Sequence, residues 1–261
     1  MSVSEPGAPE PRAPEPRARR SRLKEWTDRA GRLIRPALVD RVDRDHRQPD
    51  HEFRRRRIVV AITLVVGATL LGISLNVPPD SVAFYPLTFA LAATWVVGGF
   101  ASGPLHLGRI RFRGELRRPV VTPILLGLAA AGVFIVGAVV VREIEPLRET
   151  TENVLAFARY GSLPLIALIT VVNGIAEEIF FRGALFAAIG TWHPVAISTA
   201  VYALTTVATG NVMLVFAAVL LGLLLGLQRR ASGGILGPIL THCTWSLTML
   251  LVLPPVFAAA G

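Results

Sequence analysis

One polar segment inside an apolar run is the part of this sequence best suited to chemistry. It reads Asn173-Gly-Ile-Ala-Glu177-Glu178-Ile-Phe-Phe-Arg182-Gly183. On insertion scales, a charged side chain at the centre of a membrane-spanning helix costs about 2.5–3.5 kcal/mol, so charges in such a helix indicate a function. The sequence contains six further apolar runs, and none of them contains Asp, Glu, Lys or Arg. The acid pair and the arginine are therefore the first candidate site.

A purely structural interpretation accounts for two of these three charges. Glu178 and Arg182 are four residues apart, in the favourable order of acid before base, and would neutralise each other on one helical face. Glu177 points about 100° away from Glu178 and gains no such partner from its own helix. This interpretation leaves one acid unexplained.

A second candidate, His242, lies in the last apolar run and is followed one turn later by Ser246. With about 1.5 Å of rise per residue and a membrane core about 30 Å thick, Glu177 and His242 are expected about 9 Å and about 10 Å from the same membrane face. Paired carboxylates beside an imidazole suit the activation of water, and the imidazole can donate to a developing oxyanion or bind a metal. This is hydrolytic chemistry.

At these positions the sequence resembles a known family. Glu177-Glu178-Ile-Phe-Phe-Arg182 is similar to the EExxxR motif of the CPBP intramembrane proteases, also called Abi or CaaX-protease-like, which include the type II CaaX prenyl endopeptidases. Residues 222–227 are similar to the glycine-rich helix of the family, and residues 232–242 to its Gly-x-Ile-x-x-Pro-Ile-x-x-His run. The resemblance covers roughly residues 163–250.

The resemblance implies a helical membrane domain that cleaves a membrane-tethered protein or peptide near its C-terminus, from a cavity facing the cytoplasm. By the same analogy, Glu177 would activate the water, Glu178 and Arg182 would support it, and His242 would serve the oxyanion or a metal. A divalent ion such as zinc would have only Glu177, Glu178 and His242 as side-chain ligands. Both a metal-dependent and a metal-free reaction remain open at this point.

The chain departs from the family pattern at two positions. The second family motif, an aromatic residue followed four residues later by histidine, aligns with Tyr202-Ala-Leu-Thr-Thr206, so Thr206 replaces the histidine. Ser246 stands where Asn or Asp is usual. Threonine is neither a general base at neutral pH nor a good zinc ligand, although its hydroxyl can hold a water. We expect Tyr202, Thr206, Ser246 and Asn173 to support the site, and a catalytically inactive scaffold or substrate-binding protein is the alternative function.

Composition predicts an integral membrane protein of the all-α class. Hydrophobic residues make up 52% of the 261 residues and charged residues 17%, which excludes a disordered chain. A polytopic bundle of about seven transmembrane helices is expected over the apolar runs 58–75, 82–101, 120–141, 163–181, 195–209, 212–227 and 235–253. Helices within 58–141 would be accessory and those within 163–253 would form the family-like core. A proton-coupled transporter is a third possible class, but no internal repeat supports it.

The formal charge of +9 is concentrated in a basic tail. Residues 1–57 hold 16 of the 27 basic and 10 of the 18 acidic side chains. With seven crossings, this tail and the arginine-rich links at 109–118 and 229–230 fall on one side, so we expect a cytoplasmic N-terminus and an outer C-terminus. We expect no nucleic acid partner. The proline-rich residues 1–20 are expected to be disordered. An amphipathic helix at 21–45 would lie on the anionic cytoplasmic leaflet, or that segment is a solvated tail.

Overall fold

The computed structural model describes residues 31, 34–42, 48–112 and 114–258. The predicted disordered segment 1–20 lies outside these residues, and so does most of the amphipathic helix predicted at 21–45. Within the latter, residues 34–38 are helical.

The described chain is almost entirely helical, which confirms the predicted class. The elements are α2 (Asp50–Asn76), α3 (Phe84–Ala101), β1 (Ile110–Phe112), β2 (Glu115–Arg117), α4 (Val121–Val141), α5 (Glu145–Tyr160), α6 (Leu163–Glu178), the π-helix η1 (Ile179–Leu185), α7 (Phe186–Ile189), α8 (Pro194–Val207), α9 (Val212–Ser232) and α10 (Leu236–Ala258). The two strands pair antiparallel and form a small hairpin in the link between α3 and α4.

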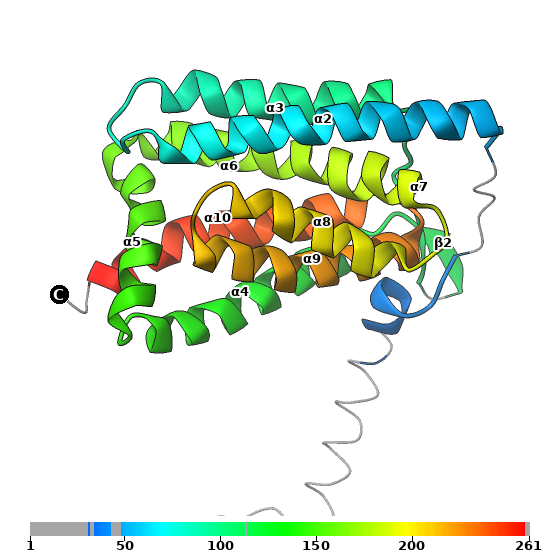
Figure 1. Ribbon diagram of the computed structural model, residues 1–261. Coiled ribbons are helices and arrows are strands. Elements are labelled where there is room, and N and C mark those ends of the chain that lie inside the picture. The colour runs from blue at the N-terminus through cyan, green and yellow to red at the C-terminus, as the bar shows by residue number, and fades with distance from the viewer. Residues whose placement is uncertain (1–30, 32–33, 43–47, 113, 259–261) are drawn as a thin grey trace, which may run out of the picture.

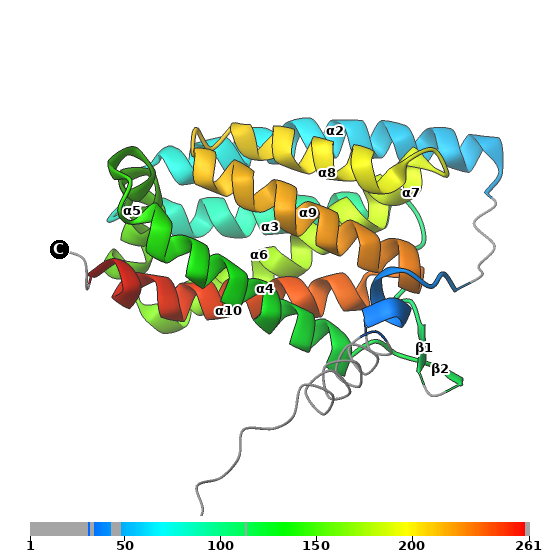
Figure 2. The ribbon, with the colours of Figure 1, turned by 90° about the horizontal axis from the view of Figure 1, so that it is seen from below.

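Every predicted apolar run is helical, and six helices among the described residues are long and apolar enough to cross a membrane. The protein is therefore an integral, multi-pass membrane protein. The remaining run, residues 195–209, forms α8, which has only 14 residues. Figures 1 and 2 show α8 beside α9, in a helical hairpin closed by the short link that contains Gly210 and Asn211.

The helices differ from the predicted apolar runs in two places. Helix α9 continues past residue 227, where the predicted run ends, to Ser232. Its last turns are polar in sequence, but Gln228 and Arg229 are buried against other helices, and the chain turns only at Gly233, where φ is +68°. The segment between the predicted runs 120–141 and 163–181 contains the helix α5, which lies across one end of the bundle and buries Leu155 and Phe157 (Figure 1).

Helix α6 occupies the middle of the bundle, between α3 and α10 (Figure 1). The main core lies where Phe180 and Phe181 of η1 pack against Trp95 of α3, with ring centroids 4.6 and 5.2 Å from the Trp95 ring. All three side chains are buried. Gly67 of α2 contacts the same tryptophan, and a Cβ atom at this position would overlap the indole ring. This core holds the segment that follows the acid pair.

The helix directions place the basic links together. The start of α2, the β-hairpin and the end of α9 lie at one end of the bundle, and α5 and the end of α10 lie at the other (Figure 1). We call the first of these ends the basic end, because it carries the arginines of residues 54–57, 109–111, 117–118 and 229–230.

Candidate functional site

The acid pair lies where the α-helix α6 passes into the π-helix η1. Glu177 and Glu178 are the last two residues of α6, and Arg182 lies in the middle of η1. All seven residues of η1 are buried. Segments of π-helix are rare and frequently occur at functional sites. No sequence signal predicted this one, since the side chains that pack around it come from other helices.

Glu178 is the centre of a buried charged cluster. Its Oε1 atom accepts a hydrogen bond from Nη1 of Arg182 at 3.0 Å and lies 2.9 Å from Nδ1 of His242 on α10. The exposed fractions of the Glu178, Arg182 and His242 residues are 0%, 1% and 6%. Glu178 and Arg182 thus pair on one helical face, as their spacing predicts, and Glu178 also contacts His242 on another helix.

Glu177 has a different environment from its neighbour. Its Oε2 atom accepts a hydrogen bond from the Tyr202 hydroxyl of α8 at 2.7 Å, and the residue is half-buried rather than fully buried. The guanidinium of Arg182 lies over the Tyr202 ring, with Cζ 4.7 Å from the ring centroid. Tyr202 therefore contacts both Glu177 and Arg182. Of the two acids, Glu177 is the one that keeps solvent-accessible surface.

The other three residues expected to support the site bond to their own helices. The hydroxyl of Thr206 donates to the Tyr202 carbonyl at 2.9 Å, and the hydroxyl of Ser246 donates to the His242 carbonyl at 2.8 Å. The amide of Asn173 donates to the Ile169 carbonyl at 3.1 Å. Thr206 and Ser246 thus lie one turn from Tyr202 and His242, on the same helical faces.

Arg229 is a residue near the site that sequence analysis assigned only to a basic link. It lies in α9, it is 5% exposed, and its Nε atom donates to the backbone carbonyl of Arg182 at 2.6 Å. Its guanidinium also lies 5.1 Å from the ring centroid of Phe186. Arg229 therefore holds the backbone of η1 from the side of α9. In the sequence, Arg229 and Arg230 follow the apolar run 212–227 after one residue. Such a pair of arginines indicates a link between helices as readily as a buried helix end.

The predicted metal ligands are not arranged as a zinc site. Among the described residues, no group of three or more His, Cys, Asp or Glu side chains is close enough to hold a metal ion. In addition, Oε1 of Glu178 already contacts both Arg182 and His242, whereas a catalytic zinc usually needs three protein ligands around one open position. Glu177, Glu178 and His242 therefore do not fit a catalytic zinc ion.

Comparisons with known proteins agree with the sequence resemblance. Residues 159–248 match the family model described as type II CAAX prenyl endopeptidase Rce1-like. The matched segment runs from the end of α5 into α10, so it contains the acid pair, Arg182, Tyr202 and His242. The match confirms the resemblance of this segment to the CPBP, or CaaX-protease-like, family. No curated protein and no solved structure matches the chain.

Proposed function

We propose, from the match of residues 159–248 to a family of CaaX endopeptidases, that this protein is an intramembrane endopeptidase that hydrolyses a peptide bond of a membrane-tethered protein. The observation that carries the proposal is the difference between the two acids. Glu178 is enclosed by Arg182 and His242, whereas Glu177 keeps accessible surface and is held by one hydrogen bond from Tyr202.

In this reaction Glu177 is the general base. Its carboxylate takes a proton from a water molecule as the water oxygen attacks the carbonyl carbon of the scissile bond. The tetrahedral intermediate then collapses, its C–N bond breaks, and the same proton passes to the nitrogen of the leaving amine. The hydrogen bond from Tyr202 fixes the orientation of the carboxylate, because it occupies Oε2. Oε1 is then the oxygen that receives the proton.

His242 stabilises the oxyanion of the tetrahedral intermediate. Because a carboxylate only accepts hydrogen bonds, Nδ1 of His242 is the donor in its contact with Glu178. The pairing orients the ring, and in the imidazolium form, in which both ring nitrogens are donors, Nε2–H is the group that donates to the oxyanion. Arg182 balances the charge of Glu178 inside the bundle. Glu177 thus acts in catalysis, and Glu178 positions His242.

The position of the cluster along the helices favours access from the basic end. His242 is six residues after the start of α10 at Leu236, which is about 9 Å along a helix. The positive-inside rule assigns the basic end to the cytoplasm, so we infer that the N-terminus and the site face the cell interior and the C-terminus lies outside.

The test is cleavage of membrane-tethered peptides by the purified protein in liposomes. Glu177→Gln removes the base and is expected to lower turnover by about 10²- to 10⁴-fold. Glu149→Gln is the matched control, since Glu149 is an exposed acid on α5, far from η1 in the sequence. Undiminished turnover in Glu177→Gln would refute the mechanism.

Thr206 motivates a second candidate function, a catalytically inactive scaffold or substrate-binding protein of the same fold. It stands in place of the family histidine, and its hydroxyl bonds to the Tyr202 carbonyl. Thr206→His distinguishes the two functions. A gain of hydrolysis in an otherwise inactive protein supports the scaffold, whereas loss of an existing activity supports Thr206 as part of a working site.

A further inference from the structure

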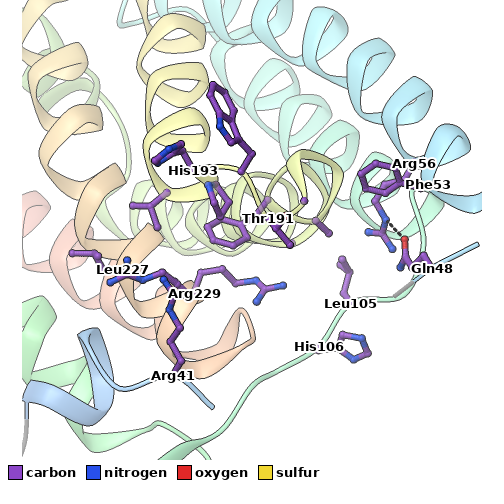
Figure 3. A pocket seen from close by; sticks show the side chains of 18 of the residues that line it. Arg41, Gln48, Phe53, Arg56, Leu105, His106, Thr191, His193, Leu227 and Arg229 are labelled. Atoms are coloured by element: carbon purple, nitrogen blue, oxygen red, sulfur yellow. Dashed lines mark hydrogen bonds between the residues drawn. The ribbon is translucent and has the colours of Figure 1, made fainter. Parts of the chain in front are cut away.

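A large pocket lies at the basic end of the bundle, separate from the acid cluster. Its volume is about 930 Å³, and its walls come from α2, the link after α3, the segment from η1 to the start of α8, and the end of α9 (Figure 3). Neither acid of the pair lines it, and His242 does not line it. The proposed peptidase reaction therefore leaves this pocket without a role.

The pocket has a strong excess of positive charge. Arg41, Arg56, Arg229 and Arg230 line it against one acid, Glu52. Figure 3 shows Arg41 and Arg229 on one side of the pocket and Arg56, bonded to Gln48, on the other. The Nε atom of Arg230 is buried and has no hydrogen-bond partner among the described residues. Guanidinium groups bind phosphate in a bidentate manner, so this lining is suited to a phosphate group.

The start of α8 adds backbone donors to the same pocket. Helix α8 begins at Pro194, which has no N–H group, so Val195 and Ala196 carry its first N–H donors, and both residues line the pocket. No side chain caps this end of the helix. The positive end of the helix dipole favours an anion at such a position. The backbone therefore favours the same ligand charge as the arginines.

One wall of the pocket is apolar and continues onto the outer surface of α9. Leu227 and Leu223 line the pocket, and Leu223 is 41% exposed. Leu220 and Phe216, at successive helical turns away from the pocket, are also exposed. Trp192, which is 71% exposed, lies at the pocket as well, and tryptophan is enriched where a membrane meets water. A free phosphate ion would make no use of this apolar stripe, but an acyl chain would.

We propose that this pocket binds the headgroup phosphate of an anionic phospholipid, whose acyl chain lies along the exposed apolar stripe of α9. Arg41, Arg230 and the start of α8 bind the phosphate, and Leu227 and Leu223 contact the first part of the chain. This binding does not depend on peptide hydrolysis, so it can be tested whether or not the protein cleaves a substrate.

The experiment titrates the full-length protein, in a zwitterionic detergent, with short-chain phosphatidylglycerol and follows binding by thermophoresis. Phosphatidylcholine with the same chains is expected to bind at least about tenfold more weakly. The double variant Arg41→Gln/Arg230→Gln is expected to weaken phosphatidylglycerol binding about fivefold for each arginine removed. Arg117→Gln is the control, because Arg117 is exposed on β2 and does not line the pocket.

Three results would overturn the proposal. These are equal affinities for the two lipids, unchanged affinity in the double variant, and competition by inorganic phosphate at concentrations equal to those of the lipid, which would assign the site to free phosphate. Arg41 is an exposed residue, so Arg41→Gln alone tests the site even if the double variant does not fold.

Discussion

The hydrogen bond between Tyr202 and Glu177 offers the sharpest test of the proposed mechanism. Tyr202→Phe removes only the hydroxyl that lies 2.7 Å from Oε2 of Glu177. The ring remains, and with it the contacts to Phe181, whose centroid is 4.7 Å away, and to the Arg182 guanidinium. The substitution therefore tests the orientation of the base without emptying the core.

The expected loss follows from the strength of a hydrogen bond to a charged group. Such a bond contributes about 1.5–3 kcal/mol, which corresponds to a decrease of about 10- to 150-fold if the full value is expressed in the transition state. Because Tyr202 acts through Glu177, we expect kcat to fall by this factor while KM changes little. The assay is cleavage of a tethered fluorogenic peptide in liposomes, and Tyr160→Phe on an exposed residue of α5 is the control.

A double-mutant cycle on stability separates positioning from packing. We expect Tyr202→Phe and Glu177→Ala to be coupled by about 1.5–3 kcal/mol in the free energy of unfolding, because the first removes the donor and the second the acceptor of the same hydrogen bond. Unchanged kcat in Tyr202→Phe, in a protein that Glu177→Gln inactivates, would refute the role of Tyr202. Additive effects on stability would refute the hydrogen bond itself.

Two further substitutions test the fold around the site through the free energy of unfolding in detergent. Glu178→Gln leaves the guanidinium of Arg182 buried without its carboxylate, so we expect a loss of about 3–5 kcal/mol. Gly67→Ala places a Cβ atom against the Trp95 ring, so we expect a loss of about 1–3 kcal/mol from overpacking, although alanine is the better helix former.

Each of these substitutions has a matched control. Glu149→Gln changes the same residue type at an exposed position and should leave stability unchanged. Gly132→Ala places its Cβ atom in open space on α4 and should be neutral or stabilising by up to about 1 kcal/mol. A stable Glu178→Gln variant would show that the buried cluster is not held by charge. Equal effects at the two glycines would show that Trp95 does not constrain the approach of α2.

Much of the architecture could be predicted from local patterns. Each apolar run became a helix because the bilayer requires every backbone polar group to bond within its own segment. A fixed rise per residue also allowed Glu177 and His242 to be assigned to one depth before any packing was known. Helix α5 was missed because its 16 residues are amphipathic and do not form an apolar run.

The partners within the site depended on tertiary contacts. Glu177 and Glu178 are adjacent in sequence and chemically alike, yet one accepts a hydrogen bond from Tyr202 on α8 and the other contacts His242 on α10. The π-helix and the bond from Arg229 to its backbone likewise depend on α3 and α9. Residue types and helical periodicity thus predicted which groups lie in membrane-spanning helices and at which level along those helices. Only the packing of helices distant in sequence decided which groups meet. Periodicity gives the direction of a side chain on its own helix, but the groups that it contacts depend on which helices pack against that face.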